Sequence, residues 1–142
     1  MRTIRFRGKD ALKGEWTEGY FAIHHIANLD NHDKLLGYTE EPYIFNDEPM
    51  QRSKGSYWHK VNPDTVGQFT GLKDKNGHDI YEGDILGIES DRSRLEVRFV
   101  RGVFAFLWNG ALDDEFPCNA PTHEWAEVIG NIHDNPKMIK RR

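Results

Sequence analysis

The stretch 66–88 constrains the fold most, because two tight reversals interrupt a pattern of apolar residues there. A segment with Phe69 and Leu72 leads into the sequence Lys-Asp-Lys-Asn-Gly at 73–77, and a segment with Ile80 leads out of it. Asn-Gly is a strong signal for a tight turn, since both residues tolerate positive φ at low cost. The stretch therefore predicts a β-hairpin.

A second reversal follows at Glu82-Gly83-Asp84, just before the apolar segment 85–88. The two acidic residues could form a carboxylate pair. Their position on either side of a glycine instead favours a tight turn whose acidic side chains face solvent. We therefore assign no catalytic role to Glu82 or Asp84.

Short strand patterns recur along the rest of the chain at intervals of roughly ten residues, which is typical of a small barrel or sandwich. Strands are expected at 4–7, 15–26, 43–45, 57–61, 95–99, 103–108 and 125–132. Two segments are expected to be loops: 27–41, because it is polar and sustains no helical pattern, and 46–56, because it carries Pro49 and Gly55. Little helix is predicted, with short turns near Pro63 or within 28–41.

Several motifs of the chain resemble those of the YopX family, a group of small phage and prophage proteins. The resemblance lies in residues 65–77 and 80–85, and in flanking motifs at 5–9, 127–132 and 135–136. Residues 28–56 carry no motif that matches. The resemblance implies a β-rich chain with an SH3-like barrel and a phage context, and it implies no catalytic residue.

The strand pattern and the resemblance together predict a mainly β fold with two parts. At 142 residues, the chain fits one domain or two small ones. The pair Asn62-Pro63 ends the strand 57–61, and Pro63 marks the expected boundary. Residues 1–62 are expected to form an N-terminal β subdomain, a layer built on a hairpin, and residues 63–142 an SH3-like small barrel domain.

Charge limits the partners that the chain can bind. The sequence holds 19 Lys and Arg against 23 Asp and Glu, which gives a net charge of −4. A protein that binds nucleic acid through phosphates needs a positive face, and neither half of this sequence is basic. Folding could still gather a basic patch. Its candidate members are Arg5, Arg7, Lys9, Lys54 and Lys60.

The sequence carries no signal for a membrane or for secretion. No run of ~18 apolar residues is present, so no transmembrane helix is expected. The first residues lack the apolar region of a secretory signal. A single cysteine, Cys118, permits no disulfide within the chain. We therefore expect a cytoplasmic protein.

The candidate metal ligands do not follow a known binding pattern. Residues 74–79 could be taken for a calcium loop, but an EF-hand register around Gly77 puts Leu72 and Gly83 at its first and last ligand positions. The seven histidines form no zinc motif. They are His24, His25, His32, His59, His78, His123 and His133. We expect no metal and no cofactor.

Cys118 is the one thiol that could act as a nucleophile. The acidic run 113–115 precedes it, and negative charge nearby would disfavour the reactive thiolate. His123 follows beyond Pro121. An inert thiol is therefore expected. No phosphate loop, dinucleotide fingerprint or nucleophile elbow is present, so the sequence predicts no enzyme.

Aromatic residues at 57–59, together with Trp16 and Tyr20, could form a stacking platform for single-stranded nucleic acid. Such platforms combine rings with a basic groove, and in sequence only Lys54 and Lys60 lie near this segment. The sequence therefore favours core positions for these rings.

The leading hypothesis is a non-enzymatic phage or prophage accessory protein that binds a protein partner or a second copy of itself. The alternative, from a different class, is a nucleic-acid-binding module. Salt-dependent binding of single-stranded DNA or RNA would separate the two. The sequence identifies no binding residue for either function.

Overall fold

The computed structural model describes residues 1–46, 57–88, 91–111, 115–117 and 121–139, and these are mainly β, which confirms the predicted fold class. The strands pair in antiparallel fashion. The chain divides into two compact units, one of Arg5–Val66 and one of Met1–Ile4 with Gly67–Arg142. No helix of the described residues is long and apolar enough to cross a membrane.

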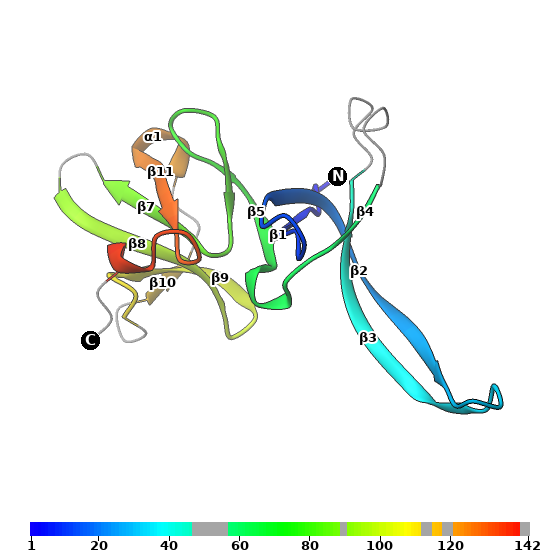
Figure 1. Cartoon of the computed structure of the whole chain (residues 1–142). Coiled ribbons are helices and arrows are strands. Elements are labelled where there is room, and N and C mark those ends of the chain that lie inside the picture. The colour runs from blue at the N-terminus through cyan, green and yellow to red at the C-terminus, as the bar shows by residue number, and fades with distance from the viewer. Residues whose placement is uncertain (47–56, 89–90, 112–114, 118–120, 140–142) are drawn as a thin grey trace. The chain divides into compact units, whose positions relative to one another are not determined.

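The unit Arg5–Val66 holds four strands in the order β4-β3-β2-β1 (Figure 1). They are β1 (Phe6–Lys9), β2 (Trp16–Leu29), β3 (Leu35–Phe45) and β4 (Trp58–Lys60), and a short 3-10 helix, η2 (Pro63–Thr65), follows. The hairpin expected in this N-terminal part is confirmed, because β1 pairs with the start of β2. The expected turn near Pro63 is η2.

The core of this unit lies on one face of the sheet. Ile44 and Val61 are 0% and 1% exposed. Gly8 leaves room for both, because a Cβ at Gly8 would lie 3.2 Å from Ile44 Cδ1 and 3.2 Å from Val61 Cβ. The ring centroids of Phe6 and Phe21 lie 5.5 Å apart.

The segment 27–41, predicted as a loop, is instead part of a long hairpin, so that prediction is wrong. β2 and β3 pair from Tyr20 with Phe45 to Leu29 with Leu35. The prediction relied on one buried face per strand, whereas most side chains of 23–40 are exposed on both faces. A strand without a buried face shows no apolar alternation in its sequence.

The second unit contains the remaining strands. They are β5 (Gly67–Lys73), β6 (Asp79–Tyr81), β7 (Asp84–Ile88), β8 (Asp91–Val100), β9 (Val103–Trp108), β10 (Glu115–Pro117) and β11 (Ala126–Asn131), with the helices α1 (Thr122–Trp125) and η4 (Pro136–Met138). β5 pairs with β6, and five strands form a sheet in the order β10-β9-β8-β7-β11. Its core cluster comprises Ile80, Leu86, Leu95, Val97, Phe106 and Ala126.

The predicted hairpin at 66–81 and the strands at 95–99 and 103–108 are confirmed. The last strand starts at Ala126, since the residues just before it form α1, a helix that the sequence did not predict. The finer prediction of an SH3-like barrel is not shown, because no closed barrel is detected in the described part of the chain.

Candidate interaction surface

The hairpin of β2 and β3 extends beyond the strands next to it. β1 pairs with β2 from Trp16 to Gly19, and β4 pairs with β3 from Tyr43 to Phe45. Residues 22–42, here called the arm, lie beyond these pairings and form a two-stranded ribbon, drawn in blue and cyan in Figure 1. The arm therefore offers two faces to a partner.

The arm reverses direction in a turn that Asp30 stabilises. Asp30 Oδ1 accepts hydrogen bonds from the backbone N–H groups of His32 at 2.8 Å and Lys34 at 3.0 Å. The backbone N–H of Asp30 donates to the carbonyl oxygen of Lys34 at 2.9 Å. Asp33 adopts a left-handed φ of 60°, which Asp tolerates better than most residues.

The turn at 74–78 is built in the same way. An Asp at the first of five turn residues is therefore the sequence signal that could have identified the turn of the arm. Asp74 Oδ1 accepts from the N–H groups of Asn76 and His78, both at 2.9 Å, and Asp74 N–H donates to His78 O at 2.8 Å. In each turn an Asp stands first among five residues. Asn-Gly marked the second turn, whereas Asp30 alone marks the first.

Large apolar side chains of the arm stay in contact with water. They are Ile23, Ile26, Leu29, Leu35, Leu36 and Tyr38, which are between 41% and 69% exposed. Single exposed apolar residues are ordinary, but a group of them on one projecting element is typical of an interaction site.

The arm is also acidic. It carries four carboxylates and one lysine, a net charge of −3 with its histidines neutral. The chain as a whole has a net charge of −4, so most of the excess lies on this short segment. An acidic surface repels phosphate and attracts lysine and arginine.

One face of the unit Arg5–Val66, here called the ring face, collects aromatic side chains from three strands. Strand register places Tyr20 opposite Phe45, and Phe45 opposite Trp58. His24 stacks on Tyr43 with ring centroids 4.3 Å apart. The other face of these strands carries the buried Ile44.

The ring face is partly open to solvent. Tyr20 is 64% exposed and Trp58 is 43% exposed. Trp58 packs on Phe45 with ring centroids 4.7 Å apart and on His24 at 4.8 Å. The prediction that these aromatic residues occupy core positions is therefore wrong for Tyr20 and Trp58. Both lie on the sheet face that is turned away from Ile44 and Val61.

Cations border the rings on the ring face. The Arg7 guanidinium lies 4.7 Å from the Trp16 ring centroid, and Lys9 Nζ lies 5.5 Å from it. Glu18 stands opposite Arg7 in the strand register. The structure thus brings Arg7 and Lys9, two members of the predicted basic patch, to this side of the ring face, and Lys60, a third member, to its far side. Lys54 lies outside the described residues.

The far side of the ring face carries a hydrogen-bonded charge pair. Lys60 Nζ lies 3.1 Å from Glu41 Oε1, and Tyr43 OH donates to Glu41 Oε2 at 3.0 Å. The hydrogen bond from Lys60, and then the one from Tyr43, hold the pKa of Glu41 below its usual value. The same carboxylate raises the pKa of Tyr43.

Asp10 joins the first turn of the unit to β4. Its Oδ1 accepts from the N–H groups of Leu12 and Lys13, and its Oδ2 lies 3.1 Å from His59 Nδ1. The N–H of Lys13 is the main cause that lowers the pKa of Asp10, while its partial burial opposes the shift. The ionised Asp10 therefore orients the His59 ring.

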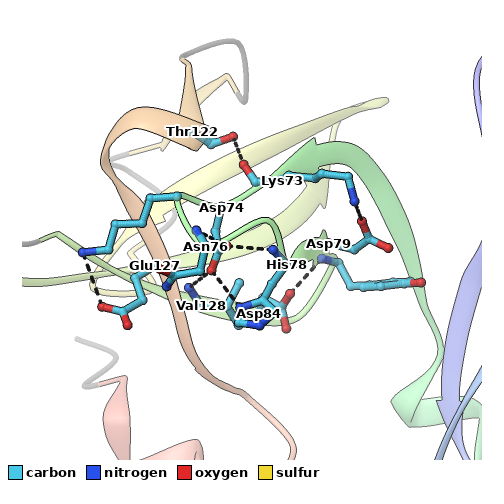
Figure 2. A network of polar contacts seen from close by, with 11 residues as sticks. Lys73, Asp74, Asn76, His78, Asp79, Asp84, Thr122, Glu127 and Val128 are labelled. Carbon is cyan, nitrogen blue, oxygen red and sulfur yellow. Dashed lines mark hydrogen bonds and ion pairs between the residues drawn. The ribbon is translucent and has the colours of Figure 1, made fainter.

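In the second unit, Asp74 is the centre of a polar network (Figure 2). Asp74 is 1% exposed, and its Oδ2 accepts from the backbone N–H of Val128 at 3.0 Å. Thr122 Oγ1 donates to the carbonyl oxygen of Lys73 at 2.9 Å. Burial raises the pKa of Asp74, but N–H groups of Val128, His78 and Asn76 outweigh it, so the pKa lies below its usual value.

In the part of the chain that the structure describes, this network holds the turn in place. Both oxygens of Asp74 accept hydrogen bonds from backbone N–H groups. The carboxylate of Asp79, in turn, lies in an ion pair with Lys73. The residues of the predicted turn thus fasten a hairpin to β11, and they do not surround a common centre.

The turn 82–84 differs from its prediction, because Asp84 is buried and does not face solvent. It is 1% exposed, and its Oδ2 accepts from the Tyr81 N–H at 2.8 Å. Gly83, with a φ of 93°, donates its N–H to Val97 O at 2.7 Å. Burial raises the pKa of Glu82. The turn lies against β8, where Asp84 is buried and Glu82 is half-buried.

Glu96 also departs from the pattern of a half-buried strand. Glu96 alternates with the apolar Leu95 and Val97, as a solvent-facing residue of such a strand would, but it is 0% exposed. Arg98 Nη2 lies 2.8 Å from Glu96 Oε1. A buried carboxylate needs such a partner, because an isolated buried charge is very costly.

The remaining candidate residues do not gather into a site. Among the residues that the structure describes, no group of three or more His, Cys, Asp or Glu side chains could hold a metal ion. His24 lies on the ring face, and His25, which is adjacent to it, lies 3.8 Å from Glu40 on the other face. Cys118 lies outside the described residues.

Comparisons with known proteins identify a family and a similar solved structure. The family model described as YopX protein matches residues 5–140. Among solved structures, the crystal structure of protein EF1440 from Enterococcus faecalis is similar at 25% sequence identity, with a TM-score of 0.48, and the match covers 99% of this chain and 100% of that one. No curated protein matches the chain.

Proposed function

Because the match over residues 5–140 shows that the chain belongs to the YopX family, we propose that it is a non-enzymatic phage or prophage accessory protein whose arm binds another protein. The observation that carries this proposal is the exposed group of six large apolar side chains on one ribbon. Fully burying one such side chain contributes roughly 1.5–3 kcal/mol. Partial burial of several in a complex would stabilise it by several kcal/mol.

Charge supports a partner different from this chain. A second arm would bring another net charge of −3 against the first, and like charges disfavour contact. A partner with Lys or Arg beside its apolar residues meets the arm with complementary charge. We therefore propose a basic, partly apolar segment of a different protein.

The test compares partner capture by the wild-type protein and by an arm variant, from cells that carry the prophage. The variant combines Leu35→Ser and Leu36→Ser, two residues that are 48% and 69% exposed. Val103→Ser is the matched control, because Val103 is also exposed, at 55%, and lies outside the arm. We expect the arm variant to retain at least about tenfold less of the partner, and the control to retain it fully.

Retention of the same partner by the arm variant would contradict the proposal. Sedimentation of the purified protein supplies a second readout. We expect the purified protein to be a monomer. If it is instead a dimer, and the arm variant is a monomer, then the partner of the arm is a second copy of this chain. Unchanged melting of both variants shows that the fold is intact.

A further inference from the structure

We propose that the ring face binds single-stranded nucleic acid, with Tyr20 and Trp58 as the stacking rings. Flat aromatic side chains on a solvent-facing antiparallel sheet accept unpaired bases, as in four-stranded RNA-binding sheets. Tyr20 and Trp58 are the two rings of this face that are most open to water, at 64% and 43% exposed. His24 belongs to both this surface and the arm, and strand alternation places Ile26 on the same face, whereas Tyr38 of the arm lies on the opposite face.

The sheet places the two rings on one face, on either side of Phe45. Tyr20 stands opposite Phe45 on β3, and Phe45 stands opposite Trp58 on β4, so one strand separates the two open rings. Phe45 lies 4.7 Å from Trp58 between ring centroids and supports it from the side. Rings held by such contacts lose little conformational freedom when a base stacks on them.

Cations on the same face favour a nucleic acid over an apolar peptide. Arg7 and Lys9 lie beside Trp16, and Lys60 lies on β4 two residues from Trp58. Binding of single strands combines such rings with positive charge that follows the phosphates. Two carboxylates, Glu18 and Glu41, lie on the same face, so the local excess of positive charge is small.

This charge balance predicts how binding responds to salt. For single strands, the slope of log K against log salt is about −0.7 per neutralised phosphate. Contacts to one to three phosphates would give a slope between about −0.7 and −2. Stacking, which depends little on salt, should therefore supply most of the affinity.

The test is a fluorescence-anisotropy titration of the full chain with a labelled oligothymidine. Alanine substitution of a stacking ring typically weakens binding by roughly 5- to 150-fold per base. We expect Trp58→Ala and Tyr20→Ala each to weaken binding by about tenfold. Trp58→Phe should recover most of the affinity, because it restores a ring at the same place.

Tyr38→Ala is the matched control. Tyr38 is 61% exposed, nearly as much as Tyr20, but the register places it opposite Ala27 on the other face of the arm. We expect Tyr38→Ala to bind the oligonucleotide like the wild type. Comparing oligonucleotide binding by Tyr20→Ala and Tyr38→Ala therefore distinguishes the ring face from the opposite face of the arm.

Three outcomes would overturn the inference. The first is no binding by the wild type up to ~10⁻⁴ M, the weak end of non-specific binding. The second is binding that Trp58→Ala and Tyr20→Ala leave unchanged. The third is an equal loss in Tyr38→Ala, since that would place the contact elsewhere. If a peptide bound at this face and the oligonucleotide did not, the ring face would be a protein site.

Discussion

Asp74→Ala should destabilise the second unit far more than the same change in the matching turn of the arm. Asp74 is 1% exposed and accepts hydrogen bonds from three backbone N–H groups, those of Asn76, His78 and Val128. Asp30 accepts two equivalent bonds, from His32 and Lys34. The two substitutions therefore differ mainly in the bond to Val128 and in burial.

The magnitude follows from the environment of each bond. In the two turns, water can hydrogen-bond to the N–H groups that lose the carboxylate, so each hydrogen bond within a turn contributes about 0.5–1 kcal/mol. The Val128 N–H belongs to a strand, and the loss of a charged acceptor there costs about 1.5–3 kcal/mol. We expect Asp74→Ala to lower the free energy of unfolding by about 4 kcal/mol, and Asp30→Ala by about 1–2 kcal/mol.

Urea denaturation of the wild type and both variants measures these differences. Amide hydrogen exchange at Val128 provides a local readout, because Asp74→Ala removes its acceptor and should accelerate exchange there. If Asp74→Ala costs no more than Asp30→Ala, the buried bond to β11 does not stabilise the unit as argued here.

The stabilisation by Asp74 should also depend on pH. Its pKa in the folded protein lies below the unfolded value of about 3.9. A lowered carboxyl pKa contributes stability above the unfolded pKa, and this contribution is lost as the pH falls through the folded pKa. The difference in stability between the wild type and Asp74→Ala should therefore be constant near neutral pH and shrink below about pH 4.

Three further outcomes are expected. Gly77→Val should lower the free energy of unfolding by about 2 kcal/mol, because Gly77 has a φ of 81°, which strains a β-branched residue. Gly77→Asn should cost less, and equal melting temperatures for the two variants would mean that backbone strain is absent. Cys118→Ser should leave the fold and any binding unchanged, and a loss of binding at unchanged melting would give the thiol a role. Random duplex DNA at ~150 mM salt should bind more weakly than ~10⁻⁴–10⁻⁶ M, and tight binding that Arg5→Glu abolishes would show a phosphate-binding patch.

The sequence by itself determined several turns and strands of the second unit and the resemblance to the family, but not α1 or the burial of Asp84. The turn at 73–77 was predictable because its signal lies in adjacent residues, and the alternation of apolar residues at 95–99 marked β8, in which Leu95 and Val97 are buried. The same reasoning failed for 27–41, since a ribbon exposed on both faces shows no such alternation.

Only the tertiary structure decided which side chains are buried and which share a surface. Asp74 and Val128 are separated by 54 positions, so no local pattern could show that this carboxylate, and not the neighbouring Asp79, accepts from β11. Tyr20 and Trp58 lie on the same face because β3 pairs with the strands of both, and most of β3 was not predicted from the sequence. Burial and side-chain contacts depend on strand pairing between residues that are far apart in the sequence, and this pairing forms only when the chain folds.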